Sequence, residues 1–134
     1  MAVYDQDPLG NLGRLQDEMF RAVRLVVDTG MHAKRWSREK AIDYMRVKTG
    51  LTQAEVTREI ERYVVWPGQA TSYKVGQQAI LAVRAKAELA LGEQFDSRLF
   101  HEALLSSGAM PLAILEWNID PVSYTHLRAH ETRG

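Results

Sequence analysis

Residues 64–77 read VVWPGQATSYKVGQ, and the rest of the chain can be interpreted outward from this stretch. A helix must end near Trp66, because Pro67 has no amide hydrogen and restricts the residue before it. Gly68 permits a sharp bend, and a second helix can begin within a few residues. The stretch therefore predicts a helix–helix corner. The polar side chains of this corner are Gln69, Tyr73 and Lys74. Such a corner can carry a site, or it can be a turn with no further role.

Upstream of the corner, apolar residues recur at helical spacings of three and four. We expect a first helix from Leu12 to about Gly30, with the glycine as its C-terminal cap. Ser37 is a suitable N-cap for a second, short helix. Thr52 and Glu55 form a capping box, which predicts the start of the helix that ends at the corner.

Downstream of the corner, the longest helix is expected over about residues 70–91. Phe95 and Phe100 flank Asp96 in the pattern of a hydrophobic staple around an N-cap, and Pro111 is placed to open a last short helix. No segment alternates apolar and polar residues as a half-buried strand does. The fold class predicted is all-α, with about six helices.

The composition is that of a soluble globular chain. Of its 134 residues, 46% are hydrophobic and 25% are charged, which suffices for a buried core. Seventeen basic residues balance seventeen acidic ones, so the charge does not favour nucleic acid or an anionic membrane as a partner. There is no cysteine and no apolar run near the roughly 18 residues of a membrane span. The pattern favours neither a cytoplasmic nor an exported location.

Residues 49–56 resemble the opening of a DNA-binding helix-turn-helix, but the helix that they begin continues to Pro67. The helix after the corner starts too late, and its first turns carry little positive charge, so we expect no nucleic-acid binding.

His126 and His130 lie four residues apart and could share a metal ion on a helix. However, residues 121–134 resemble one reading frame of a transposase-type sequencing adapter joined to a truncated gene. We therefore expect a non-native tail there and assign it no metal site.

Other polar residues have ordinary structural interpretations. His32 is expected just past the end of the first helix, where a lone histidine is most often a surface or hydrogen-bonding residue. Arg14, Arg21 and Arg24 are interleaved with acidic residues, so we expect a solvated helix face on which charges pair with one another.

Five blocks of sequence carry a resemblance to a known family. They are RLQDEMFRAVRLVVDTGMH (14–32), WSREKAIDYM (36–45), RYVVWPGQATSYKVG (62–76), LGEQFDSRLFH (91–101) and GAMPL (108–112). Together they resemble, in order, the C-terminal part of a large bacterial family catalogued as domain of unknown function 885. The resemblance spans nearly all of residues 4–120, and it implies that residues 1–120 are one helical segment truncated at both ends.

Members of that family look like zinc metallopeptidases of the gluzincin type, which cleave peptide bonds. The resemblance implies that their zinc-binding His-Glu motif, and a glutamate in a Glu-Gly-Trp segment, lie upstream of the region present here. This chain would then hold no metal itself, although the full-length parent would need zinc and a peptide substrate. Its partner would be the missing N-terminal half of its own domain, and the segment alone is expected to be inactive.

By the same resemblance, this chain would supply the other wall of the cleft. Tyr73 is the candidate for stabilising the tetrahedral oxyanion, with His32 as a second donor. Gln69 and Lys74 would orient substrate, and Asp28 would support the site without touching substrate. The alternative function is a non-catalytic helical interaction or scaffold module, in which the corner is only a turn.

Overall fold

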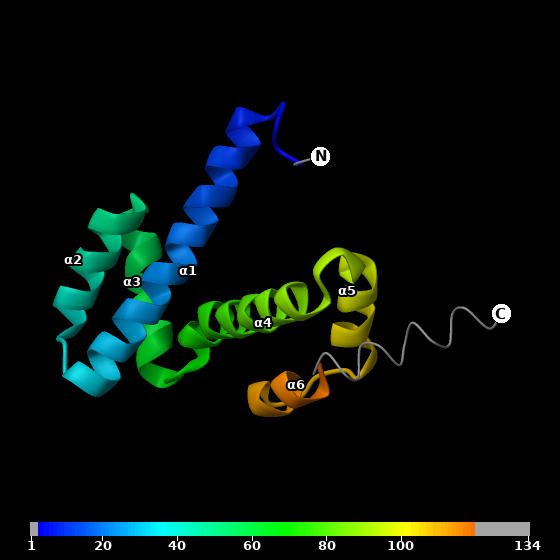
Figure 1. The fold of residues 1–134 in the computed structure, drawn as a ribbon. Coiled ribbons are helices and arrows are strands. Elements are labelled where there is room, and N and C mark those ends of the chain that lie inside the picture. Colours follow the sequence, from blue (N-terminus) through cyan, green and yellow to red (C-terminus); the bar gives the residue numbers. More distant parts are fainter. Residues whose placement is uncertain (1–2, 120–134) are drawn as a thin grey trace. The chain divides into compact units, whose positions relative to one another are not determined.

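The structure, a computed structural model, describes residues 3–119 and confirms the all-α class. Its six α-helices and one short 3-10 helix follow one another with brief connections (Figure 1). They are α1 (Pro8–Lys34), α2 (Arg38–Thr49), α3 (Gln53–Val65), α4 (Gln69–Leu91), η1 (Gly92–Gln94), α5 (Ser97–Ser106) and α6 (Leu112–Asn118). Within the described residues, no helix combines the length and the apolar character needed to cross a bilayer. The proposed tail, residues 121–134, lies outside the described part.

The helix starts predicted from capping residues are confirmed. The Ser37 hydroxyl accepts from the amide of Lys40 at 3.1 Å, at the start of α2. Thr52 and Glu55 form the reciprocal capping box of α3: the Thr52 amide donates to Glu55 Oε2 at 3.0 Å, and the Glu55 amide donates to Thr52 Oγ1. These contacts are local in sequence, so each satisfies a free amide of its own helix terminus.

The first helix is longer than predicted at both ends. It starts at Pro8, because the Asp7 carboxylate caps it by accepting from the Gly10 amide at 2.9 Å. It continues through Gly30, which was expected to end it, and the left-handed cap is Arg35 with φ 55°. The physical reason lies at Gly30, where an added Cβ would lie 2.7 Å from the indole of Trp36. The glycine is needed for close packing in the helix interior, not for a left-handed turn.

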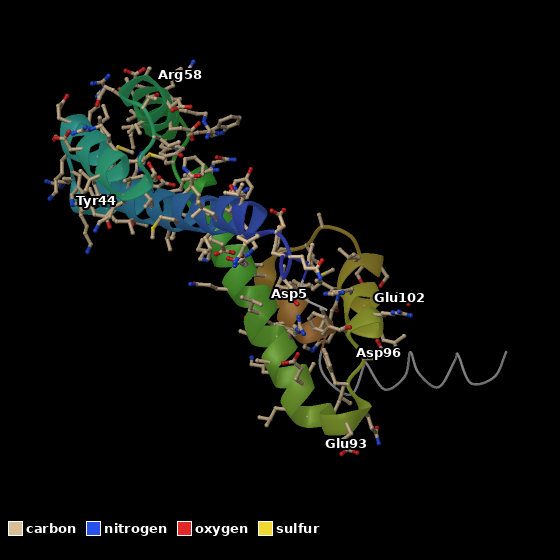
Figure 2. All side chains as sticks on the ribbon, turned by 90° about the horizontal axis from the view of Figure 1, so that it is seen from above. Asp5, Tyr44, Arg58, Glu93, Asp96 and Glu102 are labelled. Atoms are coloured by element: carbon tan, nitrogen blue, oxygen red, sulfur yellow. The ribbon has the colours of Figure 1, made fainter. Side chains whose placement is uncertain are left out.

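The described chain divides between Val75 and Gly76 into two compact units. In the first unit, α1, α2 and α3 contact one another in all three pairs (Figure 1). The first turns of α4 belong to this unit and add Ala70 to its core. The buried core residues are Val23, Val27, Ala41, Ile42, Met45, Val56, Ile60, Tyr63 and Ala70. Tyr44, labelled on α2 in Figure 2, packs its ring against Trp36 with the centroids 5.5 Å apart.

The second unit is built from the rest of α4 with η1, α5 and α6. Its buried residues are Val83, Ala87, Phe100, Leu115 and Ile119. Asp96, labelled in Figure 2 at the start of α5, accepts from the amide of Arg98 at 2.7 Å. The rings of Phe95 and Phe100 lie 6.0 Å apart on either side of this cap, which confirms the predicted staple.

Replacing Gly30 by alanine is expected to destabilise the first unit by about 1–3 kcal/mol, because the new Cβ overpacks against Trp36. The loss should appear although alanine favours a helix interior over glycine by about 1 kcal/mol. Gly13→Ala is the matched control on the same helix, since no atom lies within 4 Å of its added Cβ. That change should stabilise the chain by about 0.5–1 kcal/mol. Urea unfolding followed by circular dichroism measures both, and stabilisation by both changes would contradict the packing role of Gly30.

Candidate functional site

The corner between α3 and α4 is held from α1. Pro67 follows the end of α3, and Gly68 takes φ 85°, a backbone conformation that favours glycine. The Gly68 amide donates to the Asp28 carboxylate, at 3.0 Å to Oδ2 and 3.3 Å to Oδ1. Asp28 lies 40 residues earlier, in α1, and only 1% of it is exposed. A buried side chain of α1 therefore determines where α4 begins.

Asp28 has a second partner in His32, one turn later on α1. His32 was expected in a loop beyond the helix; that expectation is wrong because α1 extends to Lys34. Its Nδ1 lies 2.8 Å from Asp28 Oδ1 and 3.0 Å from the Asp28 carbonyl oxygen. Both neighbours accept hydrogen bonds, so the ring proton belongs on Nδ1. A neutral His32 then presents Nε2 as an acceptor, and it can donate through Nε2 only as an imidazolium.

The structure overturns the expectation that Arg24 lies on a solvated face. Arg24 is 4% exposed, and one guanidinium nitrogen (Nη2) donates to Gln69 Oε1 at 3.0 Å. The guanidinium carbon lies 4.6 Å from the ring centroid of Tyr73 and 5.4 Å from that of Tyr63. A third ring, Phe20, has its centroid at 5.6 Å. Arg24 thus connects the two corner residues Gln69 and Tyr73 with the core of the first unit.

Tyr73 is 46% exposed, so part of the residue lies at the surface of the first unit. Its ring is contacted by Arg24 and also by Arg21, whose guanidinium carbon lies 5.1 Å from the centroid. Within residues 3–119, the Tyr73 hydroxyl makes no hydrogen bond. The side chain is therefore a donor on a ring held by two cations.

Lys74 lies beside Tyr73 and is ion-paired. Its Nζ is 2.6 Å from Glu18 Oε2, and the lysine side chain is largely covered. This pair connects the second turn of α4 to α1, about three turns of α1 before Asp28. The predicted role of Lys74 in orienting substrate stays a prediction, and in this structure the ammonium faces a carboxylate.

A small polar cluster lies behind Arg24. The Tyr63 hydroxyl donates to Glu59 Oε2 at 2.5 Å, and Arg62 donates to the same oxygen at 2.6 Å. Burial would by itself raise the pKa of Glu59, but the hydrogen bonds from Tyr63 and Arg62 outweigh it, so the pKa lies below its ordinary value. Burial, aided by the bond to Glu59, raises the pKa of Tyr63 far above its ordinary value. Tyr63 is therefore a neutral phenol whose ring supports Arg24.

Four of the predicted site residues thus belong to two connected sets of contacts. Asp28 joins His32 to the Gly68 amide, and Arg24 joins Gln69 to Tyr73. The residue that sequence reasoning missed is Arg24. A signal was available, because Arg24 lies between the apolar residues Val23 and Val27, which both face the core. Arg24 was expected on a solvated face because of its charge and the acidic residues near it in sequence.

No three histidine, aspartate or glutamate side chains within residues 3–119 are grouped so that they could hold a metal ion. The described residues therefore do not fit a zinc site by themselves.

Within the described residues, the fold is an all-helical one whose α3–α4 corner is held from α1. The family described as "Bacterial protein of unknown function (DUF885)" matches residues 1–119, and the chain belongs to this family. A crystal structure of the "putative lipoprotein from Colwellia psychrerythraea" is 54% identical to this chain, with a TM-score of 0.86. The match covers 88% of this chain and 20% of that one, so the chain spans about a fifth of the relative's length. No curated protein matches.

Removing the Asp28 carboxylate should loosen the corner. Asp28→Ala leaves the Gly68 amide without its acceptor, and we expect a loss of about 1–3 kcal/mol in the free energy of unfolding. Asp17→Ala is the control on the same helix, because its pair with Arg21 is exposed and worth only about 0–1 kcal/mol. Urea unfolding measures both, and equal losses would show that the buried acceptor has no special role.

The low pKa of Glu59 predicts acid sensitivity of the first unit. The folded pKa lies below the ordinary value of 4.5, so the unfolded chain binds more protons between the two values. This contribution to stability is present above that ordinary value and is lost as the pH falls through the folded pKa. Glu59→Gln should weaken the acid dependence of the urea midpoint, whereas Glu102→Gln, at an exposed position of α5, should leave it unchanged. An unaltered acid dependence in Glu59→Gln would contradict the prediction.

Proposed function

We propose that this chain is the C-terminal helical segment of a zinc-dependent metallopeptidase and lines the side of its cleft opposite the metal. The observation that carries the proposal is Tyr73, a half-exposed residue whose hydroxyl makes no hydrogen bond within residues 3–119 and whose ring is contacted by Arg21 and Arg24. Peptide hydrolysis builds negative charge on the former carbonyl oxygen, and a fixed donor aimed at that oxygen lowers the barrier. In this proposal, Tyr73 is that donor.

The remaining side chains of the corner have supporting roles in this proposal. Gln69 shares its amide oxygen with Arg24, which leaves the amide nitrogen as a donor toward a peptide carbonyl. Lys74 would orient substrate through its charge, and Glu18 holds that charge in place. His32, fixed by Asp28 through Nδ1, would act as a second donor only in its protonated form. Asp28 supports the site by holding the Gly68 amide.

In this proposal, only the full-length parent binds zinc. The described residues do not fit a zinc site, so the metal would be held by family segments outside this chain. When bound there, zinc would activate the water that attacks the peptide bond. The residues of this chain would bind and orient the peptide and donate a hydrogen bond to the oxyanion. This segment alone would be inactive and would depend on the missing part of its domain as a partner.

The lipoprotein description of the Colwellia relative favours an exported parent over a cytoplasmic one.

A second candidate function is a helical interaction module. One face of α1 carries apolar side chains at helical spacing that stay substantially exposed within the described chain. These are Leu12, Leu15, Met19 and Val26. Such a face suits helix packing against a partner. A full-length relative that binds no zinc and cleaves no peptide would favour this function.

Tyr73→Phe at the equivalent position of a full-length relative tests the catalytic proposal. It removes only the hydroxyl, so kcat for a peptide substrate should fall by about 10²–10³, as on loss of an oxyanion donor. Zinc content and the melting temperature should stay unchanged, because the ring and its cation contacts remain.

The control is Tyr44→Phe, an equally conservative change on α2 whose ring packs on Trp36 away from the corner. It should leave kcat at the level of the unchanged enzyme. Activity of Tyr73→Phe within a few-fold of wild type, with full zinc content, would rule out the role of Tyr73.

A further inference from the structure

Arg24 is a buried cation that makes no short-range ion pair among the described residues, although the charge of Glu59 acts on it. Its hydrogen bond goes to the neutral amide of Gln69, and its Nε has no hydrogen-bond partner there. An unpaired buried charge is costly unless its surroundings compensate for it. The compensation comes in part from the charge of Glu59 and in part from the aromatic rings of Phe20, Tyr63 and Tyr73, since a guanidinium is attracted to ring faces. Hydrogen bonding alone does not account for its position.

The three rings are not equivalent. Tyr63 is fully buried and is fixed through its hydroxyl by Glu59, and Phe20 packs against the same core. Tyr73 is half-exposed and is the nearest of the three to the guanidinium. Arg24 is therefore held by the core and by Gln69. It contacts the partly exposed ring of Tyr73 from this fixed position.

Gln69 and Tyr73 lie four residues apart on α4, so their side chains share a face of the helix. Arg24 contacts both, which no other described side chain is shown to do. Arg21 also reaches the Tyr73 ring, but it is partly exposed and pairs with Asp17. The fixed support is thus Arg24, and the geometry of Gln69 relative to Tyr73 depends on it.

We propose that Arg24 is a positioning residue, which sets the direction of the Tyr73 hydroxyl through the contact of its guanidinium with the Tyr73 ring. This inference rests on the proposed function, because it takes Tyr73 as the oxyanion donor. If the guanidinium were removed, the Tyr73 hydroxyl would still be present, but its position would no longer be fixed. A displacement of about 1 Å in a reacting group can cost about 10² in rate. The effect should lie in kcat, since ground-state binding of the peptide does not need the donor.

The test is a double-mutant cycle in a full-length relative, at the positions equivalent to Arg24 and Tyr73. Arg24→Met should lower kcat by about tenfold or more while KM and zinc content stay within a few-fold of wild type. Arg24→Lys should retain more activity than Arg24→Met, because lysine keeps the positive charge. It should not restore full activity, because lysine lacks the planar guanidinium. In the Tyr73→Phe background, Arg24→Met should cause little further loss. Arg14→Met, at an exposed position on the same helix, is the control and should leave kcat unchanged.

Each outcome bears on a different claim. If Arg24→Met lowers kcat by the same factor with and without the Tyr73 hydroxyl, Arg24 does not act through Tyr73 and the inference is overturned, while the role of Tyr73 stands. If Tyr73→Phe is harmless, the proposed function fails first, and the inference fails with it. If Arg24→Met does not fold, Arg24→Lys takes its place in the cycle, and additive losses there overturn the inference in the same way.

Discussion

The hydrogen bond from the Gly68 amide to the buried Asp28 carboxylate is the contact on which the candidate site depends. Pro67 offers no amide, and Gly68 lies just before α4, where helix amides lack partners within the helix. Asp28 supplies the acceptor from the middle of α1. Once the start of α4 is held there, Gln69 and Tyr73 reach Arg24 from one helix face. A single buried carboxylate thereby sets the arrangement of several side chains that it does not touch.

This arrangement also requires α1 to be long. Arg24, Asp28 and His32 follow one another at intervals of four residues, so they align along one side of the helix. A helix that ended near Gly30 would have placed His32 in a loop and removed its contact with Asp28. Gly30 lets α1 pass close to Trp36, because it has no side chain to meet the indole. The imidazole, the carboxylate and the guanidinium therefore share one rigid element.

Much of the fold could be predicted from the sequence, because the relevant signals are local. Ser37, Thr52 and Asp96 cap their own helices within three residues, and Pro67 stops a helix whatever surrounds it. Gly30 was misjudged because a glycine that ends a helix and one that admits a distant indole look alike in sequence. Arg24 was misjudged for a related reason, since its burial depends on rings from α3 and α4. The candidate site residues near the corner were proposed from family resemblance, whereas the contacts that join them became visible only in three dimensions.

The two candidate functions use different sides of α1. With about 100° between successive residues, Asp28 and Arg24 point toward the corner, and Phe20, Val23 and Val27 point toward α2 and α3. The uncovered apolar residues Leu15, Met19 and Val26 fall on a third side, roughly opposite the corner. A partner that covered this third side would therefore leave Tyr73 accessible. Packing of α1 into a larger assembly is therefore compatible with an exposed donor on α4 at the corner.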